Sequence, residues 1–298
     1  MRGQVAASRS DMVRVIRRED AGYPSALRTL PDAPPVLYVR GEVRPSDAVA
    51  VAVVGARRAT PYGVAVAEWL GAELVRAGVV VVSGLARGID AAAHRGAIQA
   101  GGRTIAVLGC GPDIAYPPEH AGLLARIIDS GAVLTEFPPG TPPLKHQFPK
   151  RNRIISGLSL GVVVVEGRAD SGALITADCA LAQGREVFAV PGGIFAATSV
   201  LPHRLLQQGA KLVTGVEDIL EELRLPPPPP KAAAPARLEE REAAVFAQLT
   251  FDPLHIDALA RRCGLPAAEV GRALVGLELR GLARALAGQR YVRATAAG

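Results

Sequence analysis

The stretch from Phe137 to Val165 combines cationic, aromatic and amide side chains and contains no acidic residue. The residues concerned are Lys145, His146, Phe148, Lys150, Arg151, Asn152 and Arg153. Cations interleaved with an aromatic ring suit a groove for single-stranded nucleic acid, because the cations neutralise successive phosphates and the ring stacks on an unpaired base. The competing interpretation is that Phe148 lies in the core and that the charges mark the solvated start of a helix.

Small residues recur in the loops that follow the apolar runs of the chain. These loops are Gly55–Arg58, Ser83–Asp90, Gly109–Gly111, Ser171–Gly172 and Pro191–Gly193. Residues without bulky side chains let backbone N–H groups at helix N-termini approach an anion, typically a phosphate. Since two of the loops also carry arginine, Arg57 and Arg87, we expect phosphate recognition there.

Several kinds of active site are missing from the pattern. None of the four lysines follows a glycine, which excludes a P-loop ATPase, and Gly55-Ala56-Arg57 departs from the GxGxxG of dinucleotide-binding proteins. The histidines are scattered, and the cysteines lack metal-type spacing. Asp90 and His94 stand four residues apart, a spacing that we assign to structure. The sequence therefore predicts no catalytic residue, no cofactor and no metal.

The elements that must position these residues follow a regular order. Strands are predicted at residues 49–54, 79–82, 104–108, 132–135, 161–165, 186–190 and 211–213, and helices at 62–77, 88–100, 118–129, 171–183 and 200–208. Runs such as Val79–Val82 are apolar without alternation, which is typical of strands buried on both faces of a parallel sheet. The order predicts an α/β fold with a Rossmann-like, doubly wound, mainly parallel sheet, which binds ligands beyond the carboxyl ends of its strands.

Composition divides the chain into four parts. Residues 1–46 form an N-terminal extension or strap, residues 47–222 the Rossmann-like domain with the candidate nucleic-acid groove, residues 223–237 a Pro/Ala-rich linker, and residues 238–298 a winged-helix domain. The last assignment rests on helices predicted at 239–249, 255–263 and 266–279 and a hairpin at 281–293.

The charge balance limits how a polyanion could bind, and the hydropathy pattern indicates where in the cell the protein is. The middle part, residues 47–222, holds 15 cationic and 16 anionic side chains, so that a polyanion site there must come from local clustering. No apolar run is long enough to cross a bilayer, and the Arg-rich N-terminus lacks the apolar stretch of a signal peptide. We expect a cytoplasmic protein without membrane contact.

The order of the motifs resembles that of the DNA-processing A (DprA, or Smf) family. The matching segments are Val51–Arg57, Thr60–Gly63, Ser83–His94, Thr104–Gly109, Tyr116-Pro117, Phe148–Ser156, Glu166 with Ser171–Thr176, and Gly184–Gly192. They span nearly all of residues 49–215. Each segment alone is weakly specific, but the joint pattern is highly specific.

The resemblance implies a recombination mediator and not an enzyme. Such a protein binds and protects single-stranded DNA, forms a homodimer through its Rossmann-like domain and loads the RecA recombinase during natural transformation or repair. With the loop analysis, it gives the expected DNA contacts Gly55, Arg57, Ser83, Gly84, Arg87, Lys145, Phe148, Arg151, Asn152, Arg153, Ser171 and Gly172.

The chain departs from the family pattern at three places. Leu201-Pro202-His203 replaces the usual Gly-x-Asn, and Ala56 replaces the usual serine. Within residues 1–46, the extended strap covers residues 19–46, and only about 18 residues precede it. The N-terminal helical domain that many members have is therefore expected to be truncated at most.

Two other functions are alternatives to this interpretation. A nucleotide-processing enzyme similar to the lysine-decarboxylase-like phosphoribohydrolases needs an acidic PGGxGTxxE loop, whereas Pro191–Ser199 has neither Glu nor Gly-Thr. A winged-helix regulator would bind duplex DNA through phosphate contacts from Arg261, Arg262, Arg272 and Arg280. The winged helix serves equally well as a protein-contact module.

Overall fold

The computed structural model describes residues 12–227 and 238–294. Parts of the predicted N-terminal extension and linker, residues 1–11 and 228–237, lie outside these ranges. Within them, no helix is long and apolar enough to cross a membrane.

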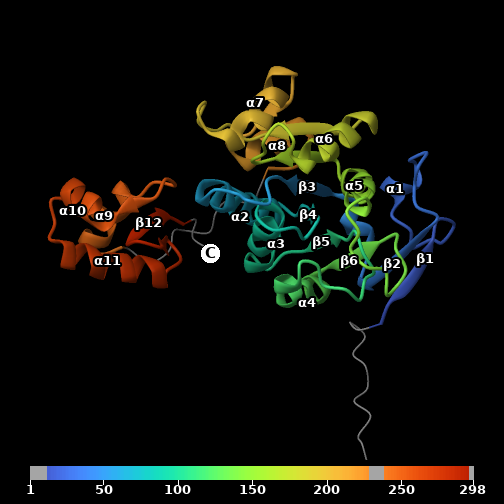
Figure 1. Cartoon of the computed structure of the whole chain (residues 1–298), viewed down its shortest axis with the longest axis horizontal. Coiled ribbons are helices and arrows are strands. Elements are labelled where there is room, and N and C mark those ends of the chain that lie inside the picture. The colour runs from blue at the N-terminus through green and yellow to red at the C-terminus, as the bar shows by residue number, and fades with distance from the viewer. Residues whose placement is uncertain (1–11, 228–237, 295–298) are drawn as a thin grey trace, which may run out of the picture.

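A nine-stranded sheet forms the centre of the main domain (Figure 1). Its strands are β1 (Arg14–Arg17), β2 (Val36–Gly41), β3 (Ala50–Val54), β4 (Val80–Ser83), β5 (Thr104–Val107), β6 (Ala132–Thr135), β7 (Gly161–Val164), β8 (Glu186–Ala189) and β9 (Lys211–Leu212). They lie in the order β1-β2-β6-β5-β4-β3-β7-β8-β9, and the strands from β6 to β9 are parallel. The mainly parallel α/β sheet that the apolar runs predicted is confirmed.

Helices cover both faces of the sheet. They are α1 (Ser25–Arg28), α2 (Pro61–Arg76), α3 (Ile89–Gln99), α4 (Ala121–Ser130), α5 (Gln147–Gly157), α6 (Gly172–Ala182), α7 (Val200–Gln207) and α8 (Val216–Glu222), with short 3₁₀ turns at Pro45–Ala48, Pro118–His120 and Ala197–Ser199. Side chains of α5, α6 and α7 share one apolar core with the strands, and α2, α3 and α8 share another on the opposite face. Figure 1 shows α6 and α7 on one side of the sheet and α2, α3 and α4 on the other.

The strand order reverses at β3. From β3 the chain runs outward through β4, β5 and β6, and then returns to place β7 on the other side of β3. The loops after β3 and β7 consequently diverge over opposite faces of the sheet. Such a reversal leaves a crevice at the carboxyl edge, which is where open α/β sheets bind ligands.

The main domain differs from the sequence-based expectations at three places. The predicted strap is part of the sheet, because β1 pairs with β2 and β2 pairs antiparallel with β6. Helix α5 was not predicted as an element, because its apolar positions are interrupted by charged residues. Helix α8 was also missed.

The C-terminal domain is a small winged helix. It contains α9 (Glu240–Gln248), α10 (Ile256–Cys263), α11 (Ala267–Leu279) and a three-stranded antiparallel sheet of β10 (Leu254–His255), β11 (Ala283–Leu286) and β12 (Arg290–Arg293). Its core is formed by leucine and valine side chains of the three helices, among them Val245, Leu259 and Leu274. The predicted helices and hairpin are therefore confirmed.

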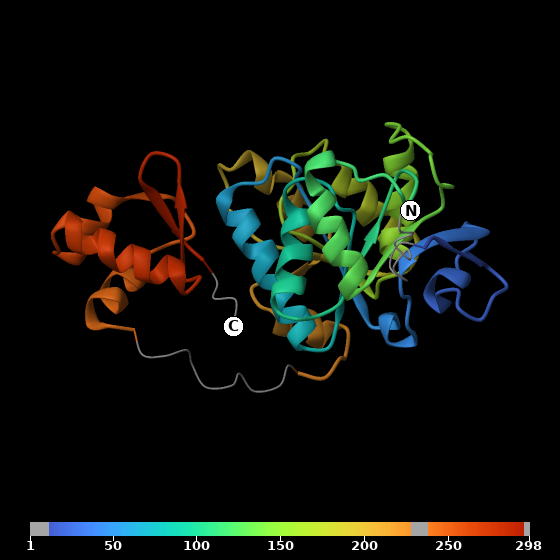
Figure 2. The same ribbon diagram turned by 90° about the horizontal axis from the view of Figure 1, so that it is seen from below.

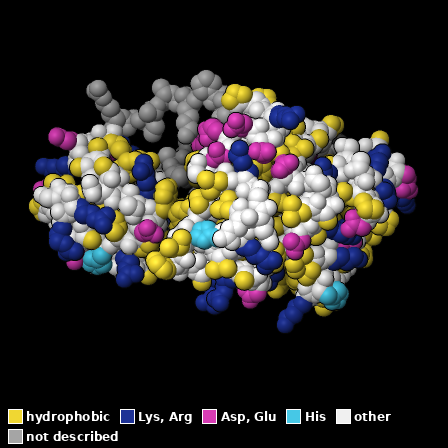
Figure 3. All heavy atoms as spheres, turned by 90° about the horizontal axis from the view of Figure 1, so that it is seen from above, with side chains coloured by type: hydrophobic (Ala, Val, Ile, Leu, Met, Phe, Trp, Pro, Cys, Tyr) yellow, Lys and Arg dark blue, Asp and Glu magenta, His cyan; other side chains and the backbone are white. Residues whose placement is uncertain are grey.

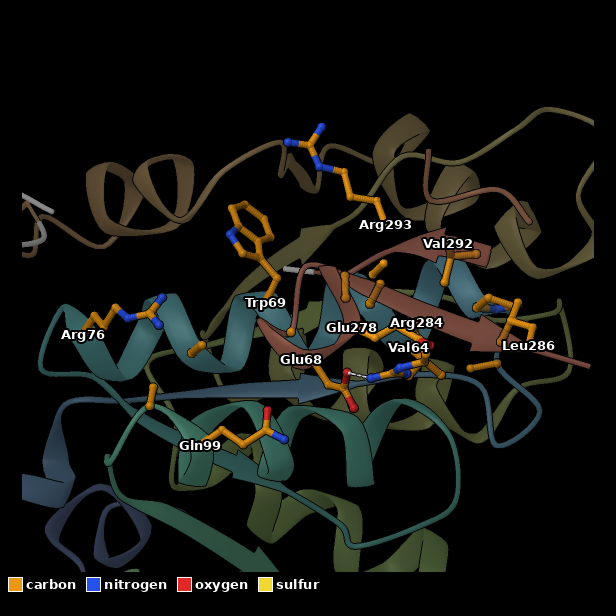
Figure 4. A pocket seen from close by; sticks show the side chains of 18 residues that line it. Val64, Glu68, Trp69, Arg76, Gln99, Glu278, Arg284, Leu286, Val292 and Arg293 are labelled. Atoms are coloured by element: carbon orange, nitrogen blue, oxygen red, sulfur yellow. Dashed lines mark hydrogen bonds and ion pairs between the residues drawn. The ribbon is translucent and has the colours of Figure 1, made fainter. Parts of the chain in front are cut away.

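The winged helix lies beside α2 (Figures 1 and 2). Arg284 of β11 forms an ion pair with Glu68 of α2 at 2.6 Å, and the Phe251 ring meets the Tyr62 ring edge-on at 6.5 Å between centroids. A cavity of about 470 Å³ remains between the two domains. Figure 4 shows Trp69 on the α2 side of this cavity and Arg293 on the winged-helix side.

Helices α2 and α3 approach each other closely at glycine residues. A Cβ atom at Gly96 would lie 1.9 Å from the backbone oxygen of Glu68, and one at Gly71 would lie 2.4 Å from the backbone oxygen of Ala93. Backbone oxygens within helices have little freedom to move away. The contact that positions α2 against the sheet therefore requires glycine.

We predict that Gly96→Ala destabilises the main domain by about 1–3 kcal/mol, the usual cost of overpacking. The control is Gly122→Ala in α4, where a Cβ meets nothing within 4 Å; it should leave stability within about 1 kcal/mol of the parent. Urea unfolding followed by fluorescence of Trp69, the single tryptophan, measures both. Equal midpoints for the two variants would contradict this account of the α2–α3 contact.

Candidate nucleic-acid interface

A pocket of about 420 Å³ opens at the carboxyl edge of the sheet where the strand order reverses. The loop after β3 forms one wall with Gly55–Arg58, and the loop after β7 forms another with Arg168 and Asp170. Helix α5 contributes its first turns, and α6 contributes its N-terminus. The pocket therefore occupies the crevice that the topology creates.

The Phe148 ring is held at the pocket by three neighbours. The Arg57 guanidinium carbon lies 5.6 Å from the ring centroid, and the Tyr116 ring packs at 5.3 Å between centroids. A Cβ at Gly109 would lie 2.8 Å from Cδ1 of the ring, so that the loop after β5 passes directly against it. Phe148 itself is half-buried, which leaves part of its surface open to the pocket.

Arg151 lies beneath the pocket and is 4% exposed. Its guanidinium donates hydrogen bonds to the carbonyl oxygens of Gly84, at 2.8 Å, and Val107. Burial lowers the pKa of Arg151 to about 10, although the neighbouring Asp90 carboxylate acts in the opposite direction. Burial also raises the pKa of Asp90, against the effect of Arg151. Arg151 thus joins α5 to the loop after β4 and to the end of β5, and with Asp90 it forms the floor of the pocket.

A second buried carboxylate holds the Arg57 loop. Glu166, which follows β7 and is 3% exposed, accepts hydrogen bonds from the Thr60 backbone N–H at 2.9 Å and the Thr60 hydroxyl at 2.5 Å. The Thr60 hydroxyl in turn accepts from the Gly63 N–H and caps α2. A Cβ at Gly63 would lie 2.4 Å from the Glu166 carboxyl carbon. Glu166 therefore fixes the end of the loop across the crevice.

The N-terminus of α6 faces the same pocket. Ser171 caps the helix by accepting a hydrogen bond from the Ala173 N–H at 3.3 Å, and the Asn152 amide donates to the Gly172 carbonyl at 3.2 Å. The positive end of the α6 dipole consequently points into a site that already contains Arg57. Such an arrangement favours an anionic ligand, and phosphate fits it.

The structure brings together a large part of the predicted set. The pocket is lined by Gly55, Arg57, Phe148, Arg151, Asn152, Ser171 and Gly172. Arg151 and Asn152 are buried and make hydrogen bonds within the protein, so they shape the pocket more than they offer a free group to a ligand.

The remaining predicted residues lie outside the lining. Ser83 is fully buried and donates to the Val53 carbonyl, and the Gly84 N–H donates to Asp90, so we correct the expectation that these groups face a phosphate. Arg153 points to Glu136 at 2.7 Å and Asp32 at 3.4 Å instead of the pocket.

Two other predicted residues, Arg87 and Lys145, are exposed. Arg87 pairs with Glu119 at 2.5 Å in solvent, and Lys145 lies in the exposed loop before α5. Neither lines the pocket. Contact between these side chains and a ligand would require a strand that extends beyond the pocket.

Sequence reasoning missed three lining or supporting side chains. Arg58 and Arg168 are exposed at the pocket, and Tyr116 packs on Phe148. The sequence offered a signal for Arg58, which directly follows Arg57 in a glycine-containing loop, but no motif pointed to Arg168. Figure 3 shows dark-blue Lys and Arg side chains projecting along the lower edge of that view.

Comparison with known proteins gives one consistent result. Residues 14–224 match the family model for DNA recombination-mediator protein A, and residues 226–289 match the DprA winged-helix domain. The Protein Smf of Escherichia coli is 43% identical over 280 residues, covering 91% of this chain and 75% of its own length. The DNA processing protein DprA of Bacillus subtilis is 46% identical over 220 residues, covering 74% of each chain.

Solved structures agree in fold. The crystal structure of DprA from Streptococcus pneumoniae superposes with a TM-score of 0.68 at 43% identity, covering 72% of this chain and 75% of that one. A structure of DNA processing protein A from Helicobacter pylori, which addresses its single-stranded DNA binding mode, gives a TM-score of 0.64 at 28% identity, covering 72% and 96%. These findings show that the chain belongs to the DNA recombination-mediator protein A (DprA) family.

Proposed function

We propose that the chain binds single-stranded DNA in the pocket where the strand order reverses, and that it does so as a recombination mediator. The carrying observation is the half-buried Phe148 ring, held between Arg57 and Tyr116 and open to the pocket. A ring in this position accepts an unpaired base, while Arg57 and the α6 N-terminus balance phosphate charge. The single-stranded DNA binding mode described for the Helicobacter pylori relative supports the assignment.

The proposed contacts follow from the lining. Gly55 and Gly172 offer backbone groups, Arg57 a charge, Phe148 a stacking surface and Ser171 a capped helix end. Arg151 and Asn152 act as supports beneath them. The exposed side chains of Arg87 and Lys145 are proposed as outer contacts for a longer strand.

Binding without catalysis fits the acidic groups at the pocket. Asp90 is 7% exposed and accepts hydrogen bonds from the loop after β4, and Glu166 is engaged by Thr60. A general acid or base must reach the proton that it transfers. The third acidic group at the pocket, Asp170, is 89% exposed and faces Arg168 at 4.0 Å. Because the two buried carboxylates are committed to the protein, we propose a binding function for the site.

The finer steps of mediation rest on family membership. We propose that the chain forms a homodimer through its main domain, protects incoming single strands and loads RecA during natural transformation or repair. The assay is ATP hydrolysis by RecA on single-stranded DNA already coated with a single-strand-binding protein. The chain should shorten the lag before hydrolysis, and an unchanged lag would oppose a loading function while leaving DNA binding open.

The winged helix carries exposed arginines, among them Arg261, Arg262 and Arg272, and a duplex-binding function remains the second candidate. We predict that truncation before Pro226 leaves binding of oligo-dT within about threefold of the full chain, because the pocket belongs entirely to the main domain. Fluorescence anisotropy with oligo-dT and a matched duplex measures this. Loss of both affinities on truncation would place the DNA site in the winged helix.

Phe148→Ala should weaken oligo-dT binding about 5- to 150-fold, since a stacked base contributes roughly 1–3 kcal/mol. Arg57→Ala should weaken binding and reduce the slope of log affinity against log salt by about 0.7, the value for one phosphate contact on a single strand. The control is Arg126→Ala, which removes one exposed charge from α4, outside the pocket. If the control matches Arg57→Ala in slope, the effect is one of net charge and not of this pocket.

Glu166→Gln tests the support of the Arg57 loop. The amide cannot accept from both the Thr60 N–H and the Thr60 hydroxyl as the carboxylate does, and hydrogen bonds to charged groups contribute about 1.5–3 kcal/mol. We expect a stability loss of that order together with weaker oligo-dT binding. The matched variant Glu73→Gln changes another buried carboxylate of the same domain, away from the pocket. Equal losses of DNA affinity in the two variants would argue against a specific positioning effect of Glu166.

A further inference from the structure

An unpartnered aromatic ring stands on the loop between β8 and α7. Phe195 is 97% exposed, more than any other large apolar residue that the structure describes, and its neighbour Ile194 is 79% exposed. Single exposed apolar residues are common, so exposure alone carries little weight. Phe195 differs from such residues in how its loop is held and in what lies beside it.

The loop is fixed at both of its ends. At the start, the Tyr62 hydroxyl donates to the Pro191 carbonyl at 2.9 Å, and His203 Nε2 lies 3.0 Å from the Gly192 carbonyl. At the end, the Gly167 N–H donates to the Thr198 carbonyl at 2.6 Å. A turn closed by the Ala196 N–H and the Gly193 carbonyl carries the ring between them. Phe195 is thus displayed from an anchored turn.

The anchor belongs to the wall of the DNA pocket. Thr198 lines the pocket, and Phe195 precedes it by three residues, which limits their separation to about 11 Å. Both follow β8, whose carboxyl end lies beside that of β7. Phe195 therefore stands on the same edge of the sheet as Phe148, close in the chain to a residue of the pocket wall.

A cation lies on the α6 side of the pocket, in the loop that Thr198 anchors. Arg168 is 73% exposed and faces Asp170, itself 89% exposed, at 4.0 Å. Such an exposed ion pair contributes little free energy, so Arg168 can turn from Asp170 to a phosphate. The negative charge of Asp170 repels a phosphate at this place, and the positive charge of Arg168 offsets that repulsion.

We propose that Phe195 is a second stacking platform, which receives a base of the strand whose preceding or following bases occupy the Phe148 pocket. The strand would cross Arg168 between the two rings. This inference rests on the proposed binding of single-stranded DNA and names a further contact of the same site. Stacking is indifferent to base identity, so the platform would add affinity and length dependence without sequence preference.

The experiment compares Phe195→Ala and Phe195→Trp on oligo-dT of about four and about twelve nucleotides. Binding of the short strand should be unchanged by either variant. Phe195→Ala should weaken binding of the long strand about 5- to 150-fold, the effect of one stacked base. Phe195→Trp keeps an aromatic ring and should bind the long strand as the parent does. The control is Leu279→Ala, which removes an apolar side chain that is 85% exposed on α11 and should change neither affinity.

Two results would overturn the inference. One is equal affinity of the parent and Phe195→Ala for the long strand. The other is equal weakening for both lengths with a lower sedimentation coefficient, which would show that Phe195 supports association between copies of the chain. Phe148→Ala on the short strand separates the two proposals: if it fails to weaken binding, the proposed function fails, whereas its success with an inert Phe195 rejects the second platform alone.

Discussion

The hydrogen bonds between Glu166 and Thr60 join two loops that the topology drives apart. Thr60 ends the loop after β3, Glu166 follows β7, and the reversal of strand order between these strands opens the crevice. A carboxylate at the N-terminus of α2 also interacts favourably with the helix dipole. The same contact explains why residue 63 is glycine, since a Cβ there would overlap the carboxyl group. The Glu166–Thr60 contact thus holds the loop after β3 in place beside the open crevice, and this loop carries Arg57 at the pocket.

The two arginines at the pocket differ in function: Arg151 is a buried support, and Arg57 is exposed to a ligand. Arg151 donates its hydrogen bonds to backbone carbonyls below the pocket, while Arg57 lies over the Phe148 ring at the surface. Burying a guanidinium is costly unless it is hydrogen-bonded, and the carbonyls of Gly84 and Val107 with the nearby Asp90 meet that requirement. The buried, hydrogen-bonded Arg151 anchors α5 three residues after Phe148, and the rings and loops around Phe148 pack against it. A preorganised ring loses less entropy when a base stacks on it.

The sequence predicted the sheet well because strands buried on both faces leave an unbroken apolar run, as in Val162–Val165. It failed at α5 because Arg151 is buried there, which removes the apolar period of a helix. Residues two apart on a helix face different sides, so the cationic run divides into Arg151 at the pocket and Arg153 at Glu136. The partner of Arg153 stands one residue before the acid-free stretch. The Glu166–Thr60 contact spans 106 residues, and no local pattern reveals it.

The pocket between β3 and β7 is proposed to receive the bases of a single strand. Photocross-linking tests it most directly, with oligo-dT that contains 4-thiothymidine, followed by proteolysis and mass spectrometry of the adducts. We expect the main cross-links on peptides containing Phe148 and Tyr116, the rings at the pocket. Cross-links confined to α10 and α11 of the winged helix would contradict it.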